Sequence, residues 1–135
     1  MNNDKTNIIT REKSIEIAKV TFDWCLSKFG NPLKTLEPKL NVSFDRRVKN
    51  YYGNYSDRVV SVFPIVCGDE KTIILTVLHE FRHFLQMPKI HNMSQYYKLF
   101  EKYNYENHPL EIDAIKFQKE HYSACRRTLK RKGVI

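Results

Sequence analysis

The feature that most constrains this chain is a pair of histidines four residues apart in a long apolar segment. His79 and His83 enclose Glu80 in the order His-Glu-Phe-Arg-His. Apolar residues around them recur at spacings that predict a largely buried helix over residues 70–87, ended by Pro88. They are Ile74, Val77, Leu78, Phe81, Phe84 and Leu85. Residues four apart on a helix share one face and are separated by about 6 Å, so both imidazoles can converge on one point.

Two converging imidazoles and a neighbouring carboxylate form a donor set that suits Zn²⁺. Burying three polar side chains costs free energy unless they have partners, and one metal ion could partner all of them. Glu80 points to a slightly different sector of the helix, where it could accept a proton from water at the metal's open position. Two ordinary core histidines are the alternative interpretation. We predict a zinc site with His79 and His83 as ligands and Glu80 as general base.

A third protein ligand is expected elsewhere, because catalytic zinc normally has three such ligands and one open position. A longer histidine motif would need histidine where the chain has Lys89. The remaining downstream candidates are His108, Glu111, Asp113 and His121. Glu111 ranks first because it falls in the first turn of a helix predicted to begin at Pro109, where the helix dipole favours a carboxylate. Asp113 and His108 rank next.

The length of the chain fits a single domain over residues 1–135. Its first predicted element is a helix over residues 10–29. Thr10 or Ser14 could cap this helix, and Gly30 would end it.

A small antiparallel sheet is expected next. Alternation over residues 40–44 and a β-branched run over residues 59–63 predict a hairpin, with residues 51–54 as its turn. Two further helices are predicted, over residues 94–103 and 109–130. The order of elements therefore predicts an α+β fold with the zinc site between the histidine helix and the last long helix.

The charge balance suggests a second class of function. Lysine and arginine total 23 against 15 acidic residues, for a net charge of +8, and part of this surplus lies near the C-terminus. The C-terminal cations are Arg126, Arg127, Lys130, Arg131 and Lys132. Such a surface favours anionic partners, nucleic acid above all, although it could simply keep the protein soluble.

The alternative prediction is therefore a basic nucleic-acid-binding module whose zinc site is structural or vestigial. Aromatic and basic residues lie close together in one stretch of the sequence, a mixture suited to base stacking and phosphate contact. They are Tyr51, Tyr52 and Tyr55, with Arg46, Arg47, Lys49 and Arg58.

Cysteine usage and hydropathy bear on the compartment. Cys25, Cys67 and Cys125 are far apart and odd in number, so they indicate neither a disulfide framework nor a CxxC pair. Residues 1–11 lack the apolar core of a signal peptide, and no segment approaches the ~20 apolar residues of a membrane span. We expect a cytoplasmic protein with no membrane partner.

The histidine segment HEFRHFLQ and the downstream segment HPLEIDAIKF together resemble the HExxH plus ExxA pattern of gluzincin metallopeptidases. The resemblance is greatest to the very short enzymes of phage and mobile-element biology, and it covers about Ile73 to Lys119. It implies a zincin-like fold, with Zn²⁺ held by His79, His83 and Glu111. It also implies that Glu80 is the general base in hydrolysis of a protein or peptide substrate.

The chain departs from the family in one respect. Gluzincins often carry Asp or Asn after the Ala of ExxA, and this chain has Ile115. Asp113 could orient a zinc ligand instead.

A donor is also needed for the oxyanion of the reaction, and candidates lie just before Glu111. These are Tyr103, Tyr105 and His108. By similarity to the sheet of these enzymes, residues 59–66 could pair with a substrate strand.

Overall fold

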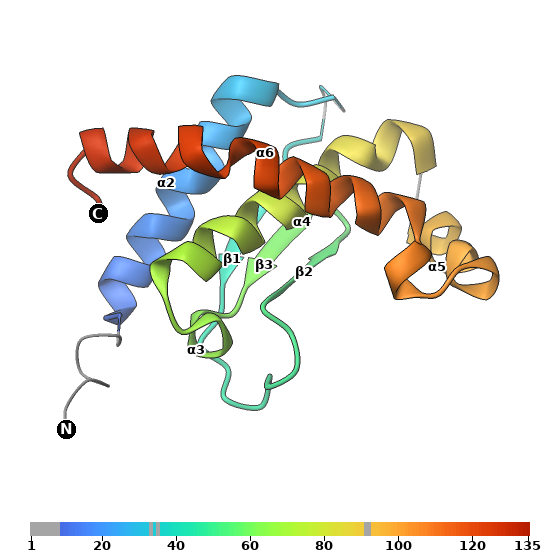
Figure 1. Ribbon diagram of the computed structural model, residues 1–135, viewed down its shortest axis with the longest axis horizontal. Helices are drawn as coiled ribbons and strands as arrows, with labels where there is room; N and C mark the ends of the chain where they lie inside the picture. Colours follow the sequence, from blue (N-terminus) through green and yellow to red (C-terminus); the bar gives the residue numbers. More distant parts are fainter. Residues whose placement is uncertain (1–8, 33, 35, 91–92) are drawn as a thin grey trace.

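The computed structural model describes residues 9–32, 34, 36–90 and 93–135, apart from the side chains of residues 88–90 and 93 (Figure 1). It has the predicted α+β composition. In chain order the elements are α2 (Arg11–Phe29), β1 (Lys39–Val42), β2 (Gly53–Ser56), β3 (Val59–Val62), α3 (Pro64–Cys67), α4 (Glu70–Ile90), α5 (Met93–Lys102), the short 3₁₀ helix η1 (Tyr105–Asn107) and α6 (Pro109–Arg131).

The sheet is mixed, so the predicted antiparallel hairpin between residues 40–44 and 59–63 is wrong. β3 is the central strand, with β1 parallel on one side and β2 antiparallel on the other. Of the predicted turn, residues 51–52 lead into β2 and residues 53–54 form its first half. The hairpin turn lies at Asp57 and Arg58, whose φ angles of 47° and 68° are the left-handed backbone conformation that a tight two-residue hairpin favours. Neither residue is the glycine that usually marks such a turn, so the sequence carried no clear signal for it.

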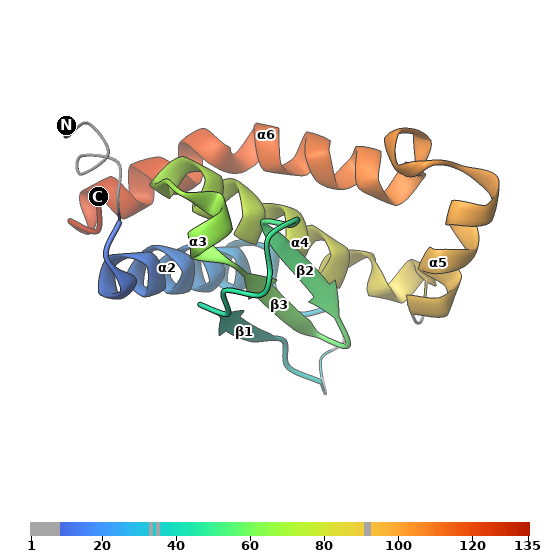
Figure 2. The same ribbon diagram turned by 90° about the horizontal axis from the view of Figure 1, so that it is seen from below.

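Helix α4 lies in the middle of the molecule and carries the histidine motif. Figure 2 shows α4 between the sheet and α6, with α2 alongside. The strands bury Val60 and Val62 on the side that joins the core, and α4 buries Phe81 and Phe84 completely. This burial leaves the His79 and Glu80 side of α4 turned toward the space between β2 and α6.

The two ends of α4 differ in how well the sequence indicates them. At the start, the Asp69 carboxylate accepts a hydrogen bond from the Thr72 N–H at 2.7 Å, which satisfies one of the free donors of the first turn. At the other end, the helix continues past Pro88 to Ile90, so the predicted stop at Pro88 is wrong. A proline so near the end removes only one hydrogen bond from the last turn, and the helix tolerates this loss.

The other predicted helices are confirmed in position. Thr10 caps α2, its hydroxyl accepting the N–H of Lys13 at 3.1 Å, and Gly30 ends this helix with a φ of 75°. α5 and α6 match the helices expected over residues 94–103 and 109–130 to within a residue or two. His108 caps α6 by accepting the Leu110 N–H.

The remaining sequence expectations concern cysteines and membranes. Cys25, Cys67 and Cys125 are buried free thiols. Within the described ranges, no helix is both long enough and apolar enough to cross a bilayer. Residues 1–8, which contributed to the expectation about a signal peptide, lie outside the described part of the chain.

Gly53 allows β2 to pack unusually close to α4. A Cβ atom at this position would lie 2.4 Å from Cγ2 of Thr76 and 2.6 Å from the carbonyl oxygen of Ser61. It would also lie 3.3 Å from Cγ of Glu80. The Ser61 oxygen belongs to the neighbouring strand and cannot rotate away, so glycine sets how near the strand comes to Glu80.

We therefore expect Gly53→Ala to destabilise the protein by about 1–3 kcal/mol, the usual cost of forcing an extra methyl into a packed site. Asn54→Ala, one residue further along the same strand, is the matched control and should cost less. Urea unfolding of both variants measures the difference. A Gly53→Ala protein as stable as the wild type would contradict the close approach.

Candidate metal centre

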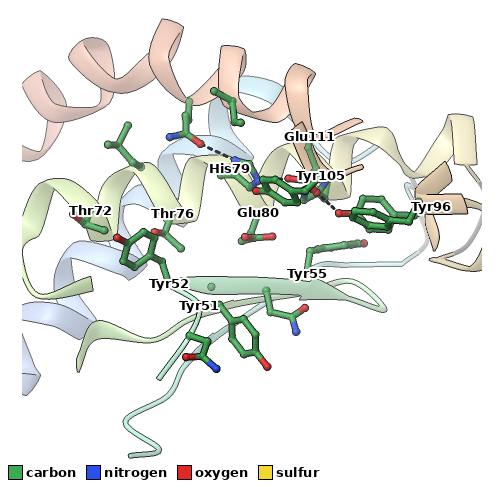
Figure 3. Close-up of a pocket in the computed structure, with 18 of the residues that line it drawn as sticks. Tyr51, Tyr52, Tyr55, Thr72, Thr76, His79, Glu80, Tyr96, Tyr105 and Glu111 are labelled. Carbon is green, nitrogen blue, oxygen red and sulfur yellow. Dashed lines mark hydrogen bonds and ion pairs between the residues drawn. The ribbon is translucent and has the colours of Figure 1, made fainter. Parts of the chain in front are cut away.

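The two motif histidines converge on the carboxylate of Glu111; His79 and Glu111 are labelled in Figure 3. Nε2 of His79 lies 2.8 Å from Oε1 of Glu111, and Nε2 of His83 lies 2.9 Å from Oε2. The histidines come from one face of α4, and Glu111 comes from the first turn of α6, where it is 3% exposed. Of the four downstream candidates, Glu111 is the one that the fold brings to both imidazoles.

The hydrogen bonds of Gln86 fix which ring nitrogen of His83 carries a proton. Nε2 of Gln86 donates to the Leu110 carbonyl and to Oδ2 of Asp113, each at 2.9 Å. Its Oε1 therefore faces Nδ1 of His83, at 2.7 Å, as an acceptor. The proton of a neutral His83 then belongs on Nδ1, and the Nε2 lone pair faces Glu111.

His79 has the same arrangement with a different glutamine. Its Nδ1 lies 2.6 Å from Oε1 of Gln118, and its Nε2 faces Glu111. Each imidazole thus has an acceptor at both nitrogens, although a neutral imidazole has only one N–H. Ligand atoms of His79, Glu80 and His83 also lie within 4.8 Å of one another. This group could hold a metal ion, and the nitrogen and carboxylate donors fit Zn²⁺.

The electrostatics of these residues favour a positive charge between them. Burial lowers the pKa of His79, but hydrogen bonding to Glu111 and the nearby carboxylate charges outweigh burial, so the pKa is raised. Burial raises the pKa of Glu111, yet hydrogen bonds from His79 and His83 pull it well below its ordinary value. Without metal, a proton on His79 supplies the positive charge between imidazole and carboxylate.

Glu80 differs from Glu111 in its surroundings. Its side chain comes from the turn of α4 that faces β2, opposite Gly53 (Figure 3). Burial raises the pKa of Glu80, and this effect exceeds the opposite effect of the two histidines. The two carboxylates of the site therefore have opposite pKa shifts, as expected when hydrogen-bond donors hold one carboxylate and burial has the dominant effect on the other.

Tyr96, on α5, is a site residue that the sequence did not indicate. Its hydroxyl donates a short hydrogen bond to Oε2 of Glu111, and its buried ring lies 5.5 Å from that of His83. Burial has the largest effect on the pKa of Tyr96 and raises it, and the hydrogen bond to Glu111 and the charge of that carboxylate raise it further, so the phenol stays protonated. Nothing in the sequence separates Tyr96 from the other seven tyrosines, because its role depends on α5 packing against the start of α6.

His108, expected as a ligand or an oxyanion donor, has a different position. It is fully buried, and its Nδ1 accepts the Leu110 N–H at 3.2 Å. Nε2 then carries the proton and donates to the Tyr96 carbonyl at 3.1 Å. Both nitrogens are occupied, so His108 joins α5 to α6 and holds Tyr96 in place.

The other expected residues divide between the cleft and its surroundings. Asp113 accepts a hydrogen bond from Gln86, which contacts His83, and it also accepts one from Arg82, whose Nε lies 2.6 Å from Oδ2. Tyr105 lines the cleft, and burial together with the Glu111 charge raises its pKa to about 12. Tyr103 does not line the cleft.

His121 lies away from the metal centre as well. Its ring packs against those of Phe117 and Phe29 at centroid distances of 4.6 and 4.9 Å. This aromatic packing accounts for the histidine without a metal.

A cleft of about 780 Å³ opens over the metal centre, between β2, α4 and the α5–α6 region. β2 forms its outer wall and is an edge strand of the sheet, whereas β3 is paired on both sides. The expectation that residues 59–66 pair with a substrate strand is therefore wrong, because the backbone of β3 already pairs with β1 and β2. The open edge belongs to residues 53–56.

The glutamines that orient the histidines should control metal affinity. Gln86→Leu and Gln118→Leu each remove the acceptor that holds one imidazole, and such losses typically weaken metal binding about 10–100-fold. Gln95→Leu, at an exposed position on α5, is the control and should leave affinity unchanged. Competition with a zinc indicator measures all three. Wild-type affinity in both the Gln86 and the Gln118 variant would show that these glutamines do not orient the ligands.

The pKa shifts predict how the stability of the metal-free protein depends on pH. Glu111 has a lowered pKa, so its contribution to the free energy of unfolding is present above pH ~4.3, the ordinary pKa of glutamate. This contribution is lost as the pH falls through the pKa of Glu111 in the folded protein. His79 has a raised pKa, so its contribution to the free energy of unfolding is present below pH ~6.5, the ordinary pKa of histidine. This contribution is lost as the pH rises through the pKa of His79 in the folded protein. The pKa of Glu80 is also raised, so its contribution to the free energy of unfolding likewise decreases as the pH rises.

Urea midpoints of chelator-treated protein should therefore be highest between about pH 4.5 and 6.5 and fall toward pH 9. Bound zinc replaces the proton, so saturation with zinc should reduce the alkaline decrease. An equally steep decrease in the metal-free and zinc-saturated proteins would contradict the assignment of the proton to His79.

Comparison with known proteins does not assign the chain to a family. No protein-family model, curated protein or solved structure matches it. The donor atoms and the cleft are therefore the features that indicate a function for this chain.

Proposed function

We propose that this chain is a zinc-dependent peptidase with a zincin-like domain, in which His79, His83 and Glu111 bind the metal. One observation carries the proposal. The lone pairs of two imidazole Nε2 atoms point at the carboxylate of Glu111, and each nitrogen lies within hydrogen-bonding distance of one carboxylate oxygen. Because Gln86 and Gln118 occupy the Nδ1 atoms, neutral histidines have no proton to place between these groups, and a divalent cation satisfies them all.

The neighbouring residues fit hydrolysis of a peptide bond. Bound zinc would supply a Lewis acid that polarises a carbonyl and acidifies water. Glu80, on the cleft side of the ligands, takes the proton of the attacking water and returns it to the leaving amine. Tyr105 holds a protonated phenol near Glu111 and can donate to an oxyanion, whereas the Tyr96 O–H is directed at Glu111 itself. The open edge of β2 can pair with an extended peptide beside Glu80.

Nucleic-acid binding remains a second candidate, and it would use a different surface. Arg127, Lys130, Arg131 and Lys132 are exposed at the end of α6, and no acidic residue follows Glu120. This end of α6 lies far from α5 (Figure 1). No lysine or arginine is among the described residues that line the cleft. Tyr51, Tyr52 and Tyr55 therefore contribute to the cleft rather than to a basic surface, and the two activities could coexist.

The decisive experiment measures metal content and peptide cleavage together. Wild-type protein should contain about one zinc per chain, and His83→Ala and Glu111→Ala should lose it, because two protein ligands rarely hold catalytic zinc. Glu80→Gln should keep the metal and lose activity by roughly 10²–10⁴-fold, the usual contribution of a general base. Elemental analysis and cleavage of a denatured protein substrate provide the readouts.

Glu101→Gln, at an exposed position on α5, is a matched control that should retain both zinc and activity. A Glu80→Gln protein that cleaves at the wild-type rate would contradict the mechanism. Zinc retained without cleavage, together with DNA binding that weakens steeply with salt, would favour the nucleic-acid module.

A further inference from the structure

The exposed aromatic side chains of this protein gather around one cleft. Among the described residues, every large aromatic side chain that is exposed also lines it. They are Tyr51, Tyr52, Tyr97, Phe100 and Tyr105. Soluble proteins seldom concentrate exposed apolar surface in one place unless that surface binds something. The cleft is therefore a recognition surface as well as the entrance to the metal centre.

The aromatic rings lie on both sides of the metal centre. Gly53 of β2 is opposite Thr76 and Glu80, and two residues later the ring centroid of Tyr55 lies 6.5 Å from that of His83. β2 therefore runs alongside α4 in the same direction. Tyr52 therefore lies near the beginning of α4, beside Thr72 and Thr76 (Figure 3).

The other group of aromatic residues belongs to α5. Tyr96 packs against His83, and the rings of Tyr97 and Phe100 each lie 5.4 Å from that of Tyr96. From Thr72 to His83 the cleft follows α4 for roughly 16 Å, at 1.5 Å per residue. That length matches about five residues of extended chain.

The backbone of β2 can hold such a chain. The Phe63 N–H donates to the Tyr52 carbonyl at 2.8 Å, which identifies Tyr52 and Phe63 as a hydrogen-bonded pair. Bonded and non-bonded pairs alternate in an antiparallel ladder, so the N–H and C=O groups of Gly53 and Tyr55 point to the open edge. An added strand would therefore pass directly beside Glu80.

The charges of the cleft limit which side chains the added strand can carry. The protein has a net charge of +8, yet Glu80 and Glu111 are the charged side chains, apart from histidine, among the described lining residues. An acidic side chain entering the cleft would lose hydration and find no lysine or arginine to compensate for the loss. Neutral aromatic side chains gain apolar burial and ring contacts at both ends.

We propose that the cleft selects an extended polypeptide segment that lacks acidic residues and carries an aromatic side chain on each side of the bond to be cleaved. One side chain packs at Tyr51 and Tyr52, and the other packs at Tyr97 and Phe100. This proposal rests on the proposed peptidase function, but it concerns binding and can be tested without cleavage.

Binding is measured with the full-length Glu80→Gln protein loaded with zinc, by calorimetry against three matched octapeptides. The first carries phenylalanine on both sides of a central Ala-Ala pair, the second has alanine at those positions, and the third has glutamate. We expect the phenylalanine peptide to bind at least ~10-fold tighter than the alanine peptide, since burying one aromatic ring contributes well over the 1.4 kcal/mol of a tenfold change. The glutamate peptide should bind weakest.

Variants at the two ends identify the two sites. With peptides that carry a single phenylalanine, Tyr52→Ala should remove the preference on one side of the central pair and Tyr97→Ala should remove it on the other. Tyr103→Ala, which lies outside the cleft lining, is the control and should change neither.

Each outcome bears on a different proposal. Equal binding of the three octapeptides, or tighter binding of oligosaccharides than of any peptide, would overturn the aromatic selection. Phenylalanine-selective binding with no cleavage by wild-type zinc protein would support the selection and overturn the peptidase. Cleavage at sites without aromatic neighbours would support the peptidase and overturn the selection.

Discussion

The contact of two imidazole nitrogens with one carboxylate, across the interface between α4 and α6, governs the arrangement around it. Glu111 is almost completely buried, and burying a carboxylate is costly unless donors or a cation surround it. Gln86 and Gln118 turn the imidazoles toward it, and Asp113 fixes Gln86. This arrangement of buried polar groups in the helix interface is energetically favourable only if a positive charge lies between the imidazoles and the carboxylate.

Local geometry explains which parts of the site could be predicted from the sequence. His79, Glu80 and His83 share one helix, so their spacing alone determines how they are presented. Glu111 could be ranked first because a carboxylate in the first turn of a helix is favoured by that helix alone. Tyr96, Gln86 and Gln118 act through contacts between different elements, and no residue pattern distinguishes them from ordinary polar residues. His108 shows the same limit, because its burial against α5 decides its role.

The fold follows a similar division. Caps and apolar periodicity identified the long helices, since both are properties of neighbouring residues. The pairing of strands was missed because β2 has the sequence Gly-Asn-Tyr-Ser, whose composition is typical of a turn rather than of a strand. The Asp57-Arg58 turn also lacks the glycine that marks most tight hairpins. The strand order matters for the cleft, because it decides that β2 and not β3 has a backbone edge left unpaired within the sheet.

The position of the proposed ligands along the chain has a consequence for the mobility of α5. His83 and Glu111 flank residues 84–110, so an ion joined to both would act as a cross-link that closes this stretch into a loop. Such closure lowers the conformational entropy of the unfolded chain. Since Tyr96 and the aromatic surface of α5 lie inside the loop, the metal would couple the order of the recognition surface to the presence of the reactive centre. If the chain is the peptidase proposed above, loss of the metal would weaken substrate binding as well as abolish catalysis.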